Sequence, residues 1–264
     1  MVEPTLTQDA PSSAEAISIL HRKLGMDYRE ILRLSCLPLF WFRVDGADPK
    51  ILHNATVTVV RSPERLFGIT AGHVIEQYRS DCVGGALRVQ LLDEVLEEVR
   101  VIDSSVKPDL ATIELDEALV LKTGRQPLSL WPPRLPQEKC GILLAGYPGT
   151  ERLLPQPLEV DWGLFTASAA TRTVTEDQIT ILVPRDPSVE NSVPPKASLG
   201  GISGGPALGL FTEPDDGLSY RLSGIITEHP DYSDSPFAIE RIVATAADVI
   251  TASGRLRYKR SEEG

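Results

Sequence analysis

The chain has 264 residues, of which 42% are hydrophobic, and it carries a formal net charge of −11 at pH 7. This length suits one two-part catalytic or binding unit, and the apolar fraction is enough for a core. The negative charge argues against nucleic acid, whose phosphates need a cationic face. There is no run of about 20 apolar residues, so we expect neither a membrane span nor a membrane partner.

The first predicted element is a helical extension within residues 1–35. Apolar side chains recur at helical spacing from Ser12 to Leu34, and a serine pair at the start offers an N-cap. Gly25 predicts a break into two helices. A strut packed on the main domain is the favoured interpretation. The alternative is an arm that docks a regulatory protein partner.

Short apolar or alternating runs with turn signals between them follow this extension. The predicted strands are Pro38–Val44, Ala55–Val60, Leu66–Thr70, Leu87–Leu92, Asp109–Leu115, Leu158–Thr166, Gln178–Val183, Pro206–Leu210 and Tyr220–Thr227. Ile242–Ser253 predicts a closing helix that Gly254 ends, and residues 255–264 form a short basic tail. Many short strands favour an all-β sandwich or a pair of barrels.

One segment places a serine among glycines, Gly201-Ile202-Ser203-Gly204-Gly205-Pro206. A serine hydroxyl attacks a carbonyl where backbone N–H groups already face the developing oxyanion. Gly201 can adopt backbone angles that a Cβ would resist, so its N–H can point inward beside that of Ser203. An ordinary Ser/Gly turn between two strands is the alternative interpretation.

A serine nucleophile needs a general base and a carboxylate that orients the base. His73 follows an apolar strand, and Asp109 opens another one. Either residue alone is more often structural than catalytic. The order His73, Asp109, Ser203 differs from the order in subtilisins and in α/β-hydrolases. Asp103 is a competing acid, ranked lower because no apolar strand follows it directly.

These motifs resemble those of trypsin-like serine peptidases. Thr70-Ala71-Gly72-His73-Val74 is similar to the family's histidine signature, and Asp109-Leu110-Ala111 to its aspartate segment. Softer likenesses are Ile142–Gly149, which resembles the opening of the second barrel, and Leu222–Thr227, which resembles the strand beside the nucleophile. The resemblance covers about residues 37–243. It implies an all-β chymotrypsin-like fold of two six-stranded antiparallel β-barrels in residues 36–254, the first about 36–125 and the second about 138–243, with N-terminal and C-terminal helices.

The chain departs from secreted trypsins at two positions. Ile202 stands where digestive trypsins carry an aspartate, so we expect no activation by a salt bridge to a freshly cut N-terminus. Val74 stands where secreted trypsins usually have a disulfide cysteine. Cys36, Cys82 and Cys140 are odd in number. Together with an N-terminus unlike a signal peptide, they predict free thiols and a cytoplasmic location. The cysteine spacing predicts no metal, and no cofactor fingerprint is present.

The pattern is closer to compact bacterial enzymes of the high-temperature-requirement type, with no room left for their PDZ domain. The resemblance implies a serine endopeptidase with His73, Asp109 and Ser203 as catalytic residues. The amides of Gly201 and Ser203 are then the oxyanion hole. The substrate-binding residues expected on the same basis are Ala197 and Ser198 at the pocket floor, and Gly224, Ile225, Ile226, Thr227 and Glu228 along a strand that pairs with an extended polypeptide substrate. Lys196 and His229 are neighbours of that pocket with no assigned preference.

Three alternatives stay open at this stage. The first is a catalytically silent peptidase-fold module that only holds a peptide. The second is a switched cytosolic effector, inactive until a partner engages the N-terminal helices or a protease cuts the 184–195 loop. The third and weakest is an esterase, because the same three residues can cleave esters.

Overall fold

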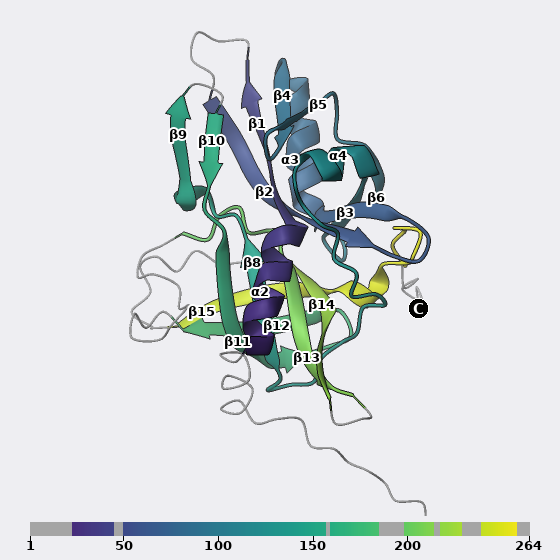
Figure 1. The fold of residues 1–264 in the computed structure, drawn as a ribbon. Helices are drawn as coiled ribbons and strands as arrows, with labels where there is room; N and C mark the ends of the chain where they lie inside the picture. Colours follow the sequence, from purple (N-terminus) through teal and green to yellow (C-terminus); the bar gives the residue numbers. More distant parts are fainter. Residues whose placement is uncertain are drawn as a thin grey trace, which may run out of the picture.

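A computed structural model describes residues 23–44, 50–156, 159–184, 198–213, 217–228 and 239–257. This part of the chain is mainly β-strand and forms two sheet systems, one above the other in Figure 1. An open sheet with two short helices occupies the upper half of the view. A closed barrel occupies the lower half, and the N-terminal helix lies along it.

The open sheet contains seven antiparallel strands in the order β5-β4-β1-β2-β3-β7-β6. In chain order the elements of this half are α2 (Lys23–Ser35), β1 (Cys36–Arg43), β2 (Lys50–Arg61), β3 (Leu66–Ala71), α3 (Gly72–Val83), β4 (Leu87–Leu91), β5 (Glu94–Leu96), β6 (Val101–Ser105), β7 (Leu110–Glu114) and α4 (Glu117–Lys122). Strands β5 and β6 form its two edges, so the sheet does not close.

The barrel contains six strands in the closed order β11-β12-β15-β14-β13-β8. The elements of this half are β8 (Gly141–Gly146), the 3-10 turn η1 (Gly149–Glu151), β9 (Arg152–Gln156), β10 (Glu159–Trp162), β11 (Phe165–Val174), β12 (Gln178–Pro184), β13 (Pro206–Thr212), β14 (Leu218–Glu228), β15 (Ile239–Ala246) and the 3-10 turn η2 (Ala247–Val249). Strands β9 and β10 pair only with each other and form a separate hairpin.

Strand β2 shows how alternation in the sequence builds both core and site. Val57 and Val59 point into the core of the open sheet. Thr56 and Thr58 alternate with them and point to the opposite face, where their hydroxyls bond to the Ser203 segment. Because successive side chains of a strand face opposite sides, one strand serves both purposes.

A shared core holds the two sheet systems and the N-terminal helix together. Its fully buried members include Phe67, Ile69 and Leu110 from the open sheet, Leu143, Ala145 and Leu208 from the barrel, and Leu32 from α2. Helix α2 makes further contacts to the barrel: Tyr28 packs on Tyr220 with ring centroids 4.4 Å apart, and Arg29 donates to Ser168 at 2.8 Å. Helix α2 is therefore a packed strut of the fold.

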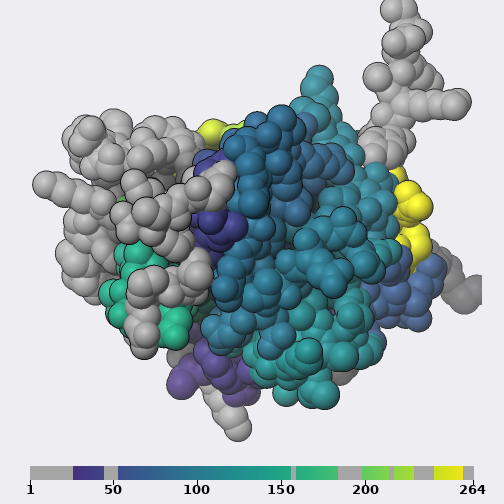
Figure 2. All heavy atoms as spheres, turned by 90° about the horizontal axis from the view of Figure 1, so that it is seen from above, coloured from purple at the N-terminus to yellow at the C-terminus, as the bar shows by residue number. Residues whose placement is uncertain are grey.

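The segment after β15 returns to the open sheet. Ser62 donates to the Ala252 carbonyl at 2.6 Å, and the Leu256 amide donates to Asp103 Oδ2 at 3.0 Å. In Figure 2 this C-terminal segment lies at the edge of a face that is formed largely by residues of the first half of the chain. The C-terminal segment thus ties the barrel to the sheet a second time.

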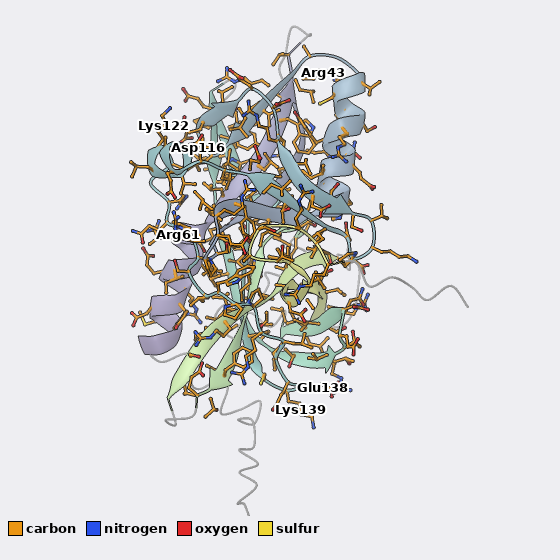
Figure 3. The ribbon with its side chains drawn as sticks, turned by 90° about the vertical axis from the view of Figure 1, so that its right-hand side faces the viewer. Arg43, Arg61, Asp116, Lys122, Glu138 and Lys139 are labelled. Carbon is orange, nitrogen blue, oxygen red and sulfur yellow. The ribbon has the colours of Figure 1, made fainter. Side chains whose placement is uncertain are left out.

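Charged side chains mark the periphery of the described molecule. The six labelled in Figure 3 lie on the outside of both halves, with Asp116 and Lys122 at the two ends of α4. Asp116 caps that helix by accepting from the Leu119 amide at 2.6 Å. None of the described helices has the length and hydropathy to cross a membrane.

Most predicted strands are present, but three expectations are wrong. The predicted pair of barrels is present in part, because the second barrel is closed with six strands whereas the N-terminal half is a seven-stranded half-barrel sheet that stays open. Ile242–Ser253 is not a closing helix, because its first half belongs to β15, which pairs with β12 and β14 and closes the barrel. A short apolar run does not distinguish a buried helix from a buried strand. Gly25 does not break the helix but lies inside α2, and Leu158–Thr166 is divided between β10 and β11.

Barrel closure by β15 has a direct test. Ile242 is fully buried in the barrel interior, whereas its neighbour Arg241 is exposed. We expect Ile242→Ala to lower the free energy of unfolding by about 2–5 kcal/mol, because it leaves a cavity. Arg241→Ala is the control and changes it by less than about 0.5 kcal/mol. Urea denaturation measures both, and equal effects would contradict the placement of β15.

Candidate active site

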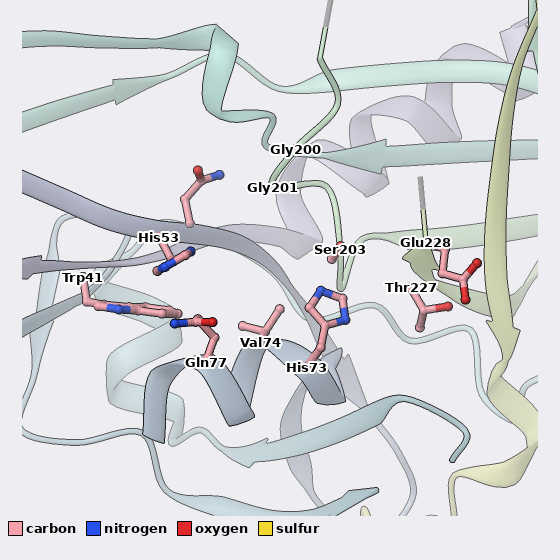
Figure 4. A pocket seen from close by; sticks show the side chains of 11 residues that line it. Trp41, His53, His73, Val74, Gln77, Gly200, Gly201, Ser203, Thr227 and Glu228 are labelled. Carbon is pink, nitrogen blue, oxygen red and sulfur yellow. The ribbon is translucent and has the colours of Figure 1, made fainter. Parts of the chain in front are cut away.

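A pocket of about 570 Å3 lies where the open sheet meets the barrel. It is lined by Trp41, His53, Asn54, His73, Val74, Gln77, Gly200, Gly201, Ser203, Thr227 and Glu228. Figure 4 shows Ser203 directly beside the His73 ring, with Glu228 on one side of this pair and His53 on the other. The structure therefore brings the predicted base and the predicted nucleophile into one pocket.

Asp109 holds His73 by two contacts. Its Oδ1 accepts from the His73 backbone amide at 2.7 Å, and its Oδ2 lies 2.9 Å from His73 Nδ1. A carboxylate only accepts hydrogen bonds, so this contact places the imidazole proton on Nδ1. Nε2 is then the nitrogen with a free lone pair.

Local sequence explains how the two residues meet. His73 is the second residue of α3, directly after β3, and Gly72 precedes it. A Cβ at position 72 would lie 2.6 Å from the Ser105 carbonyl, so only glycine allows this close approach. Asp109 has a φ of +60°, a conformation that aspartate tolerates better than most residues. Such backbone geometry is concentrated at functional sites.

The hydrogen bond to Asp109 is the largest influence on the His73 imidazole and raises the pKa of His73 above its ordinary value. Partial burial opposes this effect, and the negative charges of Asp109, Glu76 and Glu228 add to it. The imidazole is half-exposed, so a proton can also exchange with solvent. The site thus favours the imidazolium form, as a general base requires after it takes a proton.

The Ser203 loop is held from both sides. Thr56 of β2 donates its amide to the Ser203 carbonyl at 2.9 Å, and Thr58 donates its hydroxyl to the Gly204 carbonyl at 2.7 Å. On the barrel side, the Gly204 amide donates to the Ile226 carbonyl at 2.7 Å. Gly204 has a φ of +93°, and a Cβ there would overlap the Thr56 carbonyl. The glycine after the serine is therefore required by close packing.

The Gly201 and Ser203 amides are the predicted oxyanion donors, and neighbouring hydrogen bonds fix the peptides around them. The Gly149 amide donates to the Gly200 carbonyl at 2.7 Å, which turns the Gly201 amide of the same planar peptide to the opposite side. Thr56 donates its hydroxyl to the Gly201 carbonyl at 2.9 Å. Within the described chain, neither the Gly201 nor the Ser203 amide has a hydrogen-bond acceptor. Gly201 has a φ of +104°, and a Cβ there would overlap Asn54.

The His73 side chain hydrogen-bonds to Asp109 and to no other described residue. Ser203 lies next to the ring in Figure 4 without a hydrogen bond to it. In ligand-free enzymes such bonds are often long and tighten in the substrate complex. The carboxylate of the competing acid Asp103 accepts from the backbone amides of Ser104 and Leu256, whereas the His73 imidazole is bonded to Asp109.

The predicted substrate-binding residues have mixed outcomes. Ala197, like Lys196 and His229, lies outside the described residues, and Ser198 caps the neighbouring Gly200 amide at 3.3 Å without lining the pocket. Along Gly224–Ile226, strand β14 is bonded to β13 or the Ser203 loop on one side and to β15 on the other. A closed barrel leaves no free edge there, so the expectation that these three residues pair with a substrate is wrong.

Thr227 and Glu228 do line the pocket, beside Ser203 and His73. Strand β13 begins at Pro206, opposite Ile225, so β14 extends beyond its partner on the side of the Ser203 loop. Within the described chain, this end of β14 is unpaired on the β13 side, whereas on its other side Glu228 pairs with Val243 of β15. Of the residues predicted to pair with a substrate, only Thr227 and Glu228 remain candidates.

Sequence reasoning missed the residues that position the site. Thr56 bridges the Tyr147 amide and the Gly201 carbonyl, at 2.8 and 2.9 Å. Thr245 of β15 donates to the Pro108 carbonyl at 2.8 Å and so supports the turn that carries Asp109. Both are threonines in apolar strands, a pattern that many ordinary strands share. Only the spatial contact distinguishes them.

No model of a known protein family matches the chain, and no curated protein sequence matches it. The described cysteines are free, with Cys36 and Cys140 buried and Cys82 exposed. The described residues contain no group of three or more His, Cys, Asp or Glu side chains arranged to hold a metal ion. The geometry of the pocket therefore carries the functional argument.

The Asp109–His73 contact predicts a pKa change that does not depend on activity. In Asp109→Asn the negative acceptor is lost, so the pKa of His73 falls; imidazole NMR titration measures it. In the native protein the raised pKa stabilises the fold fully below the unfolded pKa of about 6.5, and this contribution is lost as pH rises through the folded value. Asp103→Asn is the matched control and leaves the His73 titration unchanged. An equal shift in both variants would refute the contact.

Proposed function

We propose that this protein is a serine endopeptidase that cleaves peptide bonds through Ser203, His73 and Asp109. The observation that carries the proposal is the conjunction of the Asp109–His73 pair with Ser203 in one pocket, next to two free backbone amides. The closed barrel and the sheet beside it are compatible with a chymotrypsin-like fold. A trypsin-like identity of the compact bacterial type is part of this proposal, and so is a polypeptide substrate.

In the proposed reaction, Ser203 Oγ attacks the substrate carbonyl carbon while His73 Nε2 takes the hydroxyl proton. Asp109 keeps Nδ1–H in place and stabilises the imidazolium. The amides of Gly201 and Ser203 receive the oxyanion of the tetrahedral intermediate. The C–N bond then breaks, and His73 gives its proton to the leaving amine. Water, deprotonated by His73, hydrolyses the acyl-enzyme and restores the serine.

An extended polypeptide suits this pocket better than a small ester. The end of β14 at Thr227 and Glu228 is paired with β15 on one side only, and its other side offers backbone groups to a substrate strand on the acyl side of Ser203. The opposite end of the pocket, at Trp41 and His53, leaves room for chain beyond the cleaved bond. A substrate that extends past Ser203 on both sides is the substrate of an endopeptidase.

The direct test compares the native protein with Ser203→Ala on a proteome-derived peptide library read by mass spectrometry. We expect Ser203-dependent cuts, and a loss of turnover on the order of 10⁶ in the variant, since the nucleophile is removed. A fluorophosphonate probe labels Ser203 in the native protein only. Ser129→Ala, a change at an exposed serine that does not line the pocket, is the control and retains activity.

The alternatives separate in the same experiment. No cuts and no labelling would overturn the proposal in favour of a silent peptide-binding module. Labelling without cuts would favour a switched effector that a partner or a proteolytic cut completes. The switched-effector alternative is tested by removing residues 1–22. Helix α2 is retained, because its Leu32 is fully buried. Ester hydrolysis without peptide cleavage would favour an esterase.

Thr56 provides a second test, of positioning. Thr56→Val removes the hydroxyl that holds the Gly201 carbonyl but keeps the side-chain volume. We expect kcat to fall by about 10–100-fold with little change in KM, less than the 10²–10³-fold loss of a whole oxyanion donor. Thr112→Val is the matched control, because Thr112 donates a buried hydrogen bond to the Gly254 carbonyl away from the pocket. An equal loss of kcat in both variants would indicate general destabilisation.

A further inference from the structure

The pocket extends well beyond the three proposed catalytic residues. Figure 4 shows the Ser203–His73 pair in its middle, with Thr227 and Glu228 at one end and Trp41, His53 and Gln77 at the other. The first end carries the end of β14, whose backbone is unpaired on the side away from β15. The second end comes from β1, β2 and α3 of the open sheet and lies on the far side of the serine. No catalytic step above uses it.

Hydrogen bonds around Asp81 make this second end rigid. Trp41 donates its indole N–H to Asp81 Oδ2 at 2.9 Å, and Gln77 donates to Asp81 Oδ1 at 3.2 Å. His53 Nε2 lies 3.7 Å from the same carboxylate, and its ring packs against Trp41 with centroids 5.8 Å apart. The polar groups of the wall are thus directed at one another and away from the open space.

The surface left for a ligand is mainly apolar. Val74 and Trp41 are almost fully buried beneath the pocket, so they form a floor, while the His53 ring is half-exposed and forms a side. A large apolar or aromatic side chain loses water on such a surface and stacks on the imidazole. A carboxylate side chain would approach Asp81 and be repelled.

The direction in which a substrate crosses the pocket decides which of its residues contact Trp41, His53 and Val74. A peptide whose acyl portion pairs with the unpaired side of this end of β14 must leave Ser203 on the opposite side. The residues after the cleaved bond therefore lie over Val74, His53 and Trp41. This assignment rests on the proposed peptidase function.

We propose that Trp41, His53 and Val74 form a specificity site that selects a large apolar or aromatic side chain within two residues after the cleaved bond. His53 is a specificity residue in this account and takes no part in the proton transfers. It supplies a flat ring beside an apolar floor. Asp81 holds the indole in place by a hydrogen bond, and its negative charge disfavours acidic side chains.

Transfer of the acyl group to added amines tests the Trp41–His53 end of the pocket separately from the Thr227–Glu228 end. N-acylated tripeptide thiobenzyl esters with different last residues form the acyl-enzyme, and free thiol reports that step. Added phenylalanine amide, glycine amide or aspartic acid amide then competes with water. The amine nitrogen forms a bond to the acyl carbon, the bond to Ser203 Oγ breaks, and the amine proton passes to His73. The ratio of new amide to free acid depends on the leaving-group side alone.

We expect phenylalanine amide to be at least ~10-fold better than glycine amide, as burial of one aromatic side chain allows. Aspartic acid amide should be the poorest. His53→Ala removes most of the preference for phenylalanine, whereas His53→Phe keeps an aromatic face and retains it. The ratio of new amide to free acid is the readout in both variants, because the benzyl leaving group itself lies on the His53 side and its release also depends on that residue. Because His53 is half-exposed, neither change endangers folding.

The two levels of the proposal fail differently. If Ser203-dependent thiol release never occurs, the peptidase function is wrong and this inference fails with it. If thiol is released but the three amides compete equally, or His53→Ala keeps the native preference, the specificity site is wrong and the peptidase function stands.

Discussion

The site depends on one constraint, the attachment of the Ser203 loop to both sheet systems at once. Thr56 of the open sheet binds the Ser203 carbonyl, and Ile226 of the barrel binds the Gly204 amide. The loop itself belongs to no strand, so its conformation follows from how sheet and barrel dock. The shared core fixes that docking, and the glycines allow backbone to approach backbone where any Cβ would overlap.

A second line of support reaches the same loop from the N-terminal helix. Arg125 donates to the Arg33 carbonyl at the end of α2, at 3.1 Å, and to the Tyr147 hydroxyl at 3.2 Å. Burial raises the pKa of Tyr147 to about 12, so the hydroxyl stays neutral and can accept this bond. The Tyr147 amide in turn donates to Thr56, which holds the Gly201 carbonyl. The strut therefore supports the proposed oxyanion site as well as the core.

Each proposed catalytic group has a different structural origin. His73 begins a helix, Asp109 occupies a strained turn, and Ser203 lies in a loop between sheet and barrel. Thr245 of the barrel supports the Asp109 turn from behind. Because these elements meet only at the junction, a small shift of barrel against sheet would separate base from nucleophile. The proposed specificity site of Trp41, His53 and Val74 belongs to the open-sheet half alone, so its geometry does not depend on how the sheet docks on the barrel.

The sequence alone predicted most strands, because period-2 alternation is a local property. The candidates His73, Asp109 and Ser203 came from the resemblance of their short segments to trypsin-like motifs. The sequence did not determine that the first sheet stays open, that Ile242 belongs to a strand, or that Gly224–Ile226 are paired on both sides. Strand pairing joins residues far apart in the chain, so tertiary structure alone decides which edges remain free. Thr56, Thr245 and the His53–Trp41 wall became visible for the same reason: their partners are distant in sequence and adjacent in space.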